Sequence, residues 1–168
     1  MIGQYNFWIN MEKNKMTTIN VRCIDCHIVN IQNQTPNYLL LKRSKNKVYP
    51  KIWQCVTGKI NLNETPIEAA LREVNEETKL SPISLWSIDY VNQYYDPNNN
   101  SMNLIPVFGM LVDQTKITLS EEHQEYKWLS FNDAKNKLLW TNQKKGLEYF
   151  QEIILNPELE KSNILKIL

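Results

Sequence analysis

Three glutamates, Glu73, Glu76 and Glu77, stand at positions i, i+3 and i+4 of the sequence. In an α-helix this spacing places three carboxylates on one face, with Cβ atoms roughly 5–6 Å apart. Hard divalent cations such as Mg²⁺ take oxygen ligands, so this acidic ridge is suited to hold one together with the phosphates of a substrate. Taken alone, however, three such glutamates more often form a solvated helix face.

The residues around the glutamates strengthen the case for chemistry. Arg72 adjoins them and is suited to hold a carboxylate through two parallel hydrogen bonds, which would fix the orientation of that carboxylate. Glu64 precedes the expected helix, where it can pair with Arg72 or with the positive end of the helix dipole. Gly58 lets the backbone approach closely, so its carbonyl oxygen is a candidate for a further metal ligand.

The glutamates need a helix to position them, and the sequence predicts one from residue 66 to about residue 79. Thr65 is suited to be the N-cap, Pro66 occupies the first helical position, and Glu68 lies three residues after the cap and completes a capping box. The expected apolar face of this helix consists of Ile67, Ala70, Leu71 and Val74.

Strands and helices are mixed along the rest of the chain. Expected strands span residues 19–31, 38–43, 52–57, 85–95, 104–112 and 126–129, and further helices are expected at 131–139 and 141–155. Turn residues predict turns at 34–37 and 96–98. Because the elements do not alternate as regular β-α-β units, we expect an α+β sandwich with a mixed sheet between helices.

The length of 168 residues suits a single domain. We expect residues 1–17 to be a loosely ordered lead-in and residues 18–168 to form the domain. A net charge of only +1 excludes coating of nucleic acid or of a membrane through bulk charge. No apolar run approaches the ~20 residues that span a bilayer, and the layout of a signal peptide is absent. These features predict a cytoplasmic protein, monomeric or homodimeric, without a nucleic-acid or membrane partner.

The chain has three cysteines, Cys23, Cys26 and Cys55, and an odd number fits a reducing compartment. Cys23 and Cys26 form a C-x-x-C, but this pair lies in an apolar, strand-like run and no second pair of ligands follows. We therefore expect no zinc site.

Residues 58–80, GKINLNETPIEAALREVNEETKL, resemble the Nudix box, G-x5-E-x7-R-E-U-x-E-E-x-G-U, in which U is a bulky aliphatic residue. The matching residues are Gly58, Glu64, Arg72, Glu73, Val74, Glu76, Glu77 and Leu80. One position departs: Lys79 stands where the family has a glycine that ends the helix in a left-handed conformation. A lysine there costs about 1 kcal/mol or shifts the helix end slightly.

The resemblance covers roughly residues 18–154 and implies the family's α/β/α sandwich, with the box as a loop–helix–loop. It also implies the family reaction, in which water attacks a phosphorus of a diphosphate bridge while Mg²⁺, or Mn²⁺ as a substitute, neutralises charge. Carried over by position, the implied metal ligands are Glu73, Glu76 and Glu77, with the Gly58 carbonyl assisting. Arg72 would orient the glutamates.

A second segment, residues 119–129 (LSEEHQEYKWL), resembles the family's L-S-x-E-H-x-x-Y-x-W-L. By position, Glu122 is implied to reach the metal site, either as an additional ligand or as the general base, and Glu73 is the competing base. A base must lie within about 3 Å of the attacking water or one water further away. We expect His123 to make a structural hydrogen bond rather than to act in catalysis.

Residues 53–58, WQCVTG, resemble the W-Q-x-V-T-G entry of Nudix relatives that cleave dihydroneopterin triphosphate or dATP-like nucleotides. This implies hydrolysis of a nucleoside or pterin triphosphate to the monophosphate and pyrophosphate. The segment 119–129 also occurs in hydrolases of diadenosine polyphosphates, so that substrate class stays open. A third hypothesis is a nucleotide-sensing Nudix module without turnover, and the intact set of carboxylates argues against it.

Candidate substrate contacts lie outside the two motifs. Lys42 and Arg43, on the strand before the box, are candidates for phosphate binding. An aromatic side chain is expected to stack on the base or pterin, and the available rings are those of Trp53, Tyr94, Tyr95 and Trp140. Asn142, at the start of the last expected helix, occupies a place where purine-reading relatives have an asparagine.

Overall fold

The structure, a computed structural model, describes residues 16–165, so residues 1–15 of the expected lead-in lie outside the described residues. The strands are β1 (Thr18–Asn20), β2 (Cys23–Gln32), β3 (Thr35–Arg43), β4 (Trp53–Gln54), β5 (Val56–Lys59), β6 (Ser84–Asp96), β7 (Ser101–Leu111), β8 (His123–Leu129) and β9 (Ile164–Leu165). The helices are α1 (Pro66–Thr78), α2 (Phe131–Lys137), α3 (Thr141–Leu155) and α4 (Pro157–Asn163).

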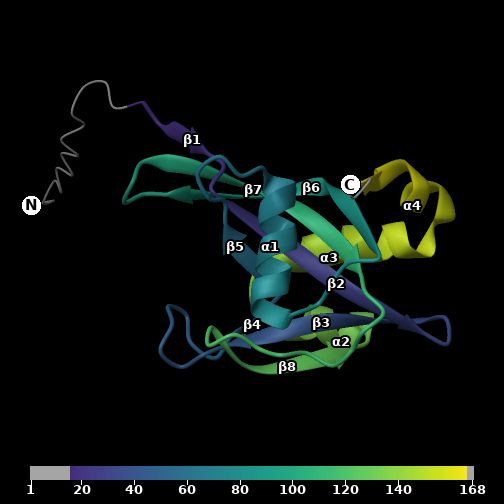
Figure 1. Ribbon diagram of the computed structural model, residues 1–168. Helices are drawn as coiled ribbons and strands as arrows, with labels where there is room; N and C mark the ends of the chain where they lie inside the picture. Colours follow the sequence, from purple (N-terminus) through teal and green to yellow (C-terminus); the bar gives the residue numbers. More distant parts are fainter. Residues whose placement is uncertain (1–15, 166–168) are drawn as a thin grey trace, which may run out of the picture.

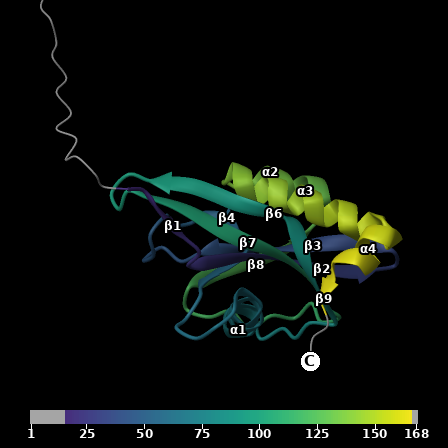
Figure 2. The same cartoon turned by 90° about the horizontal axis from the view of Figure 1, so that it is seen from above.

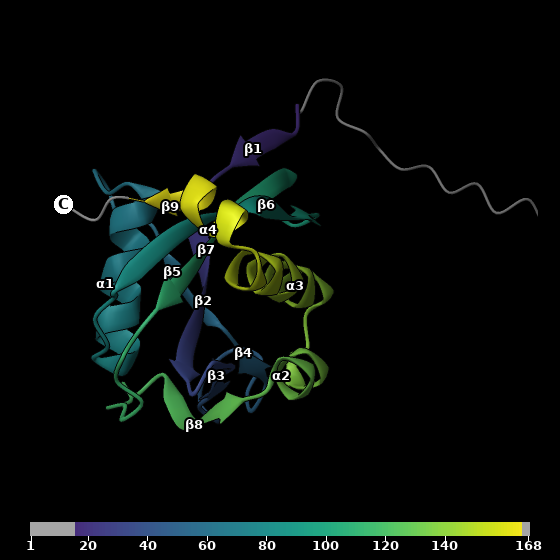
Figure 3. The same cartoon turned by 90° about the vertical axis from the view of Figure 1, so that its right-hand side faces the viewer.

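A mixed sheet lies between α1 on one face and α2 and α3 on the other (Figures 2 and 3). The strand order is β4-β3-β2-β7-β6-β9, with β8 paired to β3, β5 to β2 and β1 to β7. Strand β2 runs parallel to β7 and antiparallel to β3 and β5. The expected α/β/α sandwich with a mixed sheet is confirmed. Strands β6 and β7 form a long hairpin that, together with β1, extends beyond the other strands (Figure 1).

Each face of the sheet has its own apolar core, because side chains alternate along β2. On the α1 face, Ala69, Ala70 and Val74 pack against Ile24 and Cys26. On the α3 face, the packed residues include Val29, Trp86, Leu147, Phe150 and Ile153. One expectation for α1 is wrong: Ile67 is 40% exposed, and Ala69 lies in the core in its place.

Three boundaries around β2 and β3 differ from the sequence expectation. The strand expected at 19–31 is split at residues 21–22 into β1 and β2, which pair with separate parts of β7. The turn expected at 34–37 is wrong, because the chain turns at Asn33 and Gln34, both with positive φ, and residues 35–37 belong to β3. The strand expected at 52–57 is two short strands, β4 and β5, separated by Cys55.

The expected capping box of α1 is confirmed. The Thr65 side chain accepts a hydrogen bond from the Glu68 backbone amide, and the Glu68 carboxylate accepts one from the Thr65 amide at 2.7 Å. At the other end, Lys79 adopts the left-handed conformation, with φ 61° and ψ 17°. The departure from the family glycine therefore changes the residue type and leaves the helix end in place.

The C-terminal helices agree with expectation except at two points. Helix α3 has the expected bounds, whereas α2 ends at Lys137, two residues before the expected end. Beyond α3, the chain forms α4 and the short strand β9, which pairs with β6 at the sheet edge. No helix in the described part of the chain is long and apolar enough to cross a membrane.

Candidate active site

Arg72 is the centre of a hydrogen-bond network that joins α1 to the loop before it. Its guanidinium donates to both carboxylate oxygens of Glu64, at 2.7 and 2.9 Å, so of the two alternatives for Glu64 the structure shows the pairing with Arg72. Nη1 donates to Glu73 at 2.8 Å and to Glu76 at 3.1 Å. Nη2 also donates to the Lys59 carbonyl at 2.7 Å. Arg72 thus constrains two of the three glutamates of the acidic ridge.

Gly58, in β5, lies directly against the Glu73 side chain. A Cβ atom at this position would overlap the Glu73 carboxylate, so any larger residue would displace it. The φ angle of Gly58 is not positive, and close approach rather than backbone conformation is therefore what requires the glycine. Glu73 is largely enclosed, and burial raises its pKa above the ordinary value.

Glu77 is the most buried carboxylate of the acidic ridge, with a side chain only 4% exposed. Its Oε2 atom has no hydrogen-bond partner among the described residues. Burial, followed by the negative charges of Glu73 and Glu122, raises the pKa of Glu77 to about 9. A carboxylate removed from water without a donor is costly, and neighbouring carboxylates increase that cost.

His123 does not supply the missing partner. Its Nδ1 atom lies 3.8 Å from the Glu77 Oε2 atom, beyond hydrogen-bonding distance. Burial lowers the pKa of His123 to about 4, so its imidazole is neutral at neutral pH. The structural hydrogen bond expected for His123 is absent, because neither ring nitrogen has a partner in the part of the chain that the structure describes.

Glu122, just before β8, approaches the same carboxylates from a distant part of the sequence. Its charge contributes to the raised pKa values of both Glu73 and Glu77. Lys47 lies 2.8 Å from the Glu122 carboxylate, and this hydrogen bond lowers the pKa of Glu122. The two sequence motifs therefore meet in one group, which we call the carboxylate cluster: Glu73, Glu76, Glu77 and Glu122.

The carboxylate cluster fits a divalent cation in charge and in donor type. As the side chains stand, no three acidic, histidine or cysteine residues within 16–165 have a geometry that could hold a metal ion, and two of the glutamates face Arg72 instead. The buried, unpartnered oxygen of Glu77 is the observation that fits a cation. Mg²⁺ prefers such oxygen ligands and usually keeps waters and substrate phosphates as the remainder.

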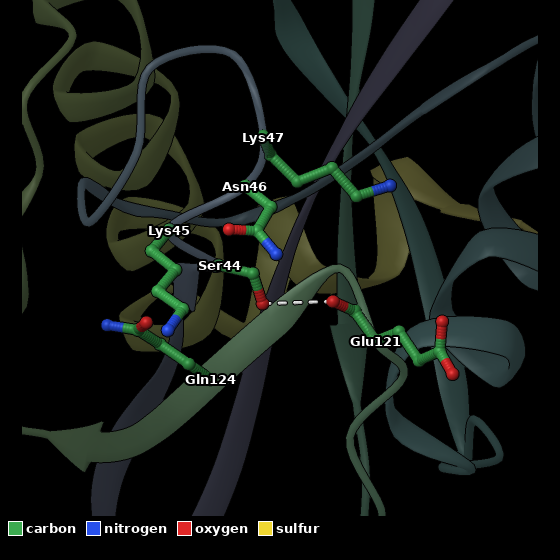
Figure 4. A pocket seen from close by; sticks show the side chains of 6 residues that line it. All are labelled: Ser44, Lys45, Asn46, Lys47, Glu121 and Gln124. Atoms are coloured by element: carbon green, nitrogen blue, oxygen red, sulfur yellow. Dashed lines mark hydrogen bonds between the residues drawn. The ribbon is translucent and has the colours of Figure 1, made fainter.

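A cavity of about 450 Å³ opens beside the carboxylate cluster, between the β3–β4 loop and the segment before β8 (Figure 4). Its lining residues are Ser44, Lys45, Asn46, Lys47, Glu121 and Gln124. The Ser44 hydroxyl donates to the Glu121 carbonyl at 2.9 Å and joins the two walls (Figure 4). The sequence analysis named Lys42 and Arg43 but not this loop, although residues 44–51 contain three further basic residues and no acidic one.

The two basic residues predicted to bind phosphate, Lys42 and Arg43, have different neighbours in the structure. Arg43 is close enough to the carboxylate cluster for its charge to lower the pKa values of Glu77 and Glu122. Lys42 instead forms an ion pair with Glu125 at 2.9 Å. The ring of Trp53 already faces ammonium groups at 5.1–5.5 Å, those of Lys42, Lys127 and Lys137. The structure thus brings Arg43 to the cluster and places Lys42 beside Trp53.

The other two predicted substrate contacts already have partners in the protein. The Tyr95 hydroxyl donates to Asn100 at 2.9 Å near the tip of the β6–β7 hairpin. The Asn142 amide nitrogen donates to the Gln93 carbonyl at 3.0 Å, and its oxygen accepts from the Tyr90 hydroxyl at 3.1 Å. Sequence reasoning overlooked Asp25, a buried acid on the α3 face of β2, although an acidic residue inside an apolar strand is itself a signal.

Comparisons with known proteins show which family the chain belongs to. The family model described as "NUDIX domain" matches residues 21–150. The chain is 30% identical over 124 residues to "Nucleoside triphosphatase NudI" of Klebsiella pneumoniae, covering 68% of this chain and 86% of the relative. It is 26% identical over 148 residues to "Dihydroneopterin triphosphate diphosphatase" of Escherichia coli, covering 80% and 94%.

The same fold is found among solved structures. A solved binary complex of a Caenorhabditis elegans Ap4A hydrolase superposes with a TM-score of 0.66 at 21% identity, covering 81% of this chain and 98% of that one. The family match spans both motifs and the strands that carry them. The chain therefore belongs to the Nudix hydrolases and is a hydrolase of phosphoanhydride bonds.

Proposed function

We propose that this hydrolase converts a nucleoside triphosphate, or a pterin triphosphate, to the monophosphate and pyrophosphate in a Mg²⁺-dependent reaction. The observation that carries the proposal is the enclosed Glu77 carboxylate, which has carboxylate neighbours and no donor for Oε2. A triphosphate beside the carboxylate cluster would be repelled by the negative charges of the cluster unless cations lie between them. The printed activities of the two sequence relatives support this substrate class.

The residues that would hold Mg²⁺ are the four of the carboxylate cluster, together with the Gly58 carbonyl oxygen. Bound Mg²⁺ supplies positive charge to the reacting phosphoryl group and to the leaving phosphates. Arg72 orients Glu73 and Glu76 through its hydrogen bonds to both. Arg43 and Lys47 border the cluster and add positive charge where the triphosphate would lie.

In the proposed reaction, a water oxygen forms a bond to the α-phosphorus. The bond from this phosphorus to the bridging oxygen breaks, and pyrophosphate leaves with the electron pair. A glutamate of the cluster accepts the proton of the attacking water, and Glu73 and Glu122 are the two candidates for this general base. The remaining carboxylates hold the cation, so that each member of the cluster has a role.

A Mg²⁺-dependent hydrolysis screen tests the proposal. The panel contains the dNTPs, 7,8-dihydroneopterin triphosphate, diadenosine tetraphosphate and ADP-ribose, with products separated by chromatography. We expect one triphosphate to yield a monophosphate and pyrophosphate. Glu76→Gln should reduce that rate by about 10²-fold or more, the scale of removing one group that stabilises transition-state charge. Glu152→Gln, an exposed carboxylate on α3, serves as the control and should keep the rate.

A dinucleoside polyphosphate is the second candidate substrate. The cavity beside Glu122 favours it, because lysines line a volume of about 450 Å³ that would accommodate further phosphates. Release of ATP from diadenosine tetraphosphate would establish this alternative in place of the triphosphate.

Full activity of Glu76→Gln would contradict the assignment of the cluster. A folded, Mg²⁺-binding protein that hydrolyses nothing in the panel would instead indicate a nucleotide-sensing module.

A further inference from the structure

The α3 face of the sheet contains a buried polar group that the proposed hydrolysis does not use. We call it the Asp25 cluster: Asp25 of β2, Asn92 of β6 and Gln143 of α3, each at most 5% exposed. The amide nitrogens of Asn92 and Gln143 donate to the two oxygens of Asp25, the latter at 3.3 Å. Burial raises the pKa of Asp25 to about 6, against the lowering effect of hydrogen bonds from Thr57 and both amides. The carboxylate is therefore ionised at neutral pH.

Asp25 determines how both amides are oriented. An ionised carboxylate only accepts hydrogen bonds, so each amide turns its NH₂ group towards it. The amide oxygens, Asn92 Oδ1 and Gln143 Oε1, therefore point away from Asp25. Both are buried, and neither has a hydrogen-bond partner within the described residues. Buried acceptors without donors are rare in folded proteins, and two in one cluster indicate that a group with donors belongs there.

Side chains two or three residues from the Asp25 cluster on β2, β6 and α3 are more exposed than the cluster itself. Tyr94, two residues further along β6, is 52% exposed, and Trp140, at the N-cap of α3, is 39% exposed. Cys23, two residues earlier on β2, is half-buried. Tyr49 of the β3–β4 loop packs edge-on against Trp140, with ring centres 5.2 Å apart. Partly exposed aromatic rings therefore lie two to three residues along the chain from members of the cluster, and exposed rings of this kind can stack on a planar ring.

The Asp25 cluster also adjoins the carboxylate cluster. Thr57 of β5 lies opposite Asp25 in the register of β2 and β5, and it contributes a hydrogen bond to the Asp25 carboxylate. The next residue, Gly58, lies against Glu73. One peptide unit of β5 therefore connects the two clusters, which lie on opposite faces of the sheet.

We propose that Asn92 Oδ1 and Gln143 Oε1, held by Asp25, are the ring-recognition acceptors of the substrate site. They take adjacent N–H groups of a 2-amino-4-oxo pyrimidine ring, the edge that guanine and pterin share, with Gln143 Oε1 accepting from the 2-amino group and Asn92 Oδ1 from the ring N–H. This inference rests on the proposed function and narrows its substrate class. Adenine does not fit, because its ring nitrogen at that edge is an acceptor, and hypoxanthine offers only one donor. Gln143 has this role rather than Asn142, whose amide is engaged by Tyr90 and Gln93.

The first test compares kcat/KM for GTP, ITP, ATP and 7,8-dihydroneopterin triphosphate. GTP and ITP differ only in the 2-amino group, so we expect GTP to be preferred by about 10-fold or more, the scale of one buried hydrogen bond, with ATP poorer still. Comparison of kcat/KM for 7,8-dihydroneopterin triphosphate with that for GTP shows whether the pterin or the guanine nucleotide is the better substrate. Equal kcat/KM values for GTP and ITP in an active enzyme would overturn the inference and leave the proposed hydrolysis intact.

Gln143→Met removes one acceptor at similar volume and should bring the GTP-to-ITP ratio to within about 2-fold of unity. Lys145→Met, on the exposed side of the same helix, introduces a methionine away from the cluster and should keep the ratio. An unchanged ratio in Gln143→Met, or its loss in Asn142→Ala instead, would contradict our assignment. If Gln143→Met does not fold, the GTP-to-ITP ratio of the wild type and the binding experiment below test the inference.

Binding without metal separates this inference from the hydrolysis. The side-chain NH₂ resonances of Asn92 and Gln143 are followed by ¹⁵N NMR while metal-free protein is titrated with guanosine, with inosine as the matched control. We expect guanosine to shift both resonances and inosine to shift them less. Selective shifts without any triphosphate hydrolysis would refute the proposed function and support the ring site. No shift at saturating guanosine, as expected if water alone fills the cluster, would refute the ring site.

Discussion

Glu77 and Asp25 are carboxyl groups on opposite faces of one sheet, and both residues are 3% exposed. Asp25 accepts hydrogen bonds from Asn92 and Gln143, and its pKa is raised only to about 6. Glu77 has an unpartnered oxygen and carboxylate neighbours, and its pKa is raised to about 9. The two carboxyl groups are equally buried, so their different neighbours account for the difference between their pKa values. Donors make Asp25 a fixed part of the fold, whereas like charges leave Glu77 in need of a cation.

The largest expected effect concerns activity on the Glu77 side. Glu77→Gln should lower the hydrolysis rate by about 10²–10³-fold, because an amide removes a charge that would hold the cation. The same variant should leave the metal-free protein at least as stable as wild type, since it removes repulsion from Glu73 and Glu122. Steady-state kinetics and thermal unfolding in EDTA measure both effects. Near-normal activity would show that Glu77 is not part of the metal site.

Asp25 should respond in the opposite way, with stability as the main readout. Asp25→Leu leaves two buried amide donors without an acceptor, so we expect a loss of about 2–4 kcal/mol in the free energy of unfolding. Urea denaturation of the metal-free protein measures it. Asp25→Asn keeps the shape and serves as the milder comparison. A loss below about 0.5 kcal/mol would mean that the donors around Asp25 find other partners, and the contrast with Glu77 would disappear.

Mg²⁺ should stabilise the folded protein by binding to the carboxylate cluster, which contains Glu77, and not to Asp25. At about 100 times its dissociation constant, a ligand that binds only the folded state adds about 2.7 kcal/mol to the free energy of unfolding. We expect this gain in wild type and in Asp25→Asn, and its loss in Glu77→Gln. Thermal unfolding across a Mg²⁺ titration measures it. An equal gain in all three proteins would place the cation elsewhere.

The two carboxyl groups should also destabilise the metal-free protein in different pH windows. Both folded-state pKa values are raised, so each contribution is complete below the unfolded pKa and is lost as the pH rises through the folded one. For Asp25 the loss runs from about pH 3.8 to about 6, and for Glu77 from about pH 4.5 to about 9. We expect a fall in Tm of several degrees in EDTA. Glu77→Gln should remove the part above pH 6, and a Tm independent of pH would contradict both assignments.

The smallest expected effect concerns Lys79, which lies outside both carboxyl sites. Lys79→Gly at the end of α1 should raise the free energy of unfolding by about 0.5–1 kcal/mol, because glycine adopts the left-handed conformation without the Cβ penalty. Activity and the Mg²⁺ response should stay at wild-type values. Urea denaturation measures the gain. A loss of stability would show that the lysine side chain has contacts that outweigh its backbone cost.

Local features of the site followed from the sequence alone. The start of α1 at Pro66, its capping box, the ridge of glutamates and the bounds of α3 were predicted, and the pairing of Arg72 with Glu64 was one of two alternatives considered for Glu64. The helix features depend on residues up to four positions apart, and the Arg72 pair spans eight. Periodicity, capping and short-range charge pairing therefore determine them whatever the rest of the chain does.

Tertiary structure decided which side of each element became buried. The sequence pattern placed Ile67 in the core and did not predict which glutamate is buried, whereas α1 buries Ala69 and Glu77 and leaves Ile67 40% exposed. The Asp25 cluster unites residues from β2, β6 and α3, and Glu122 meets the glutamates of α1 across the fold. Strand register and helix rotation bring these groups together, and both depend on packing between segments that are far apart in the chain.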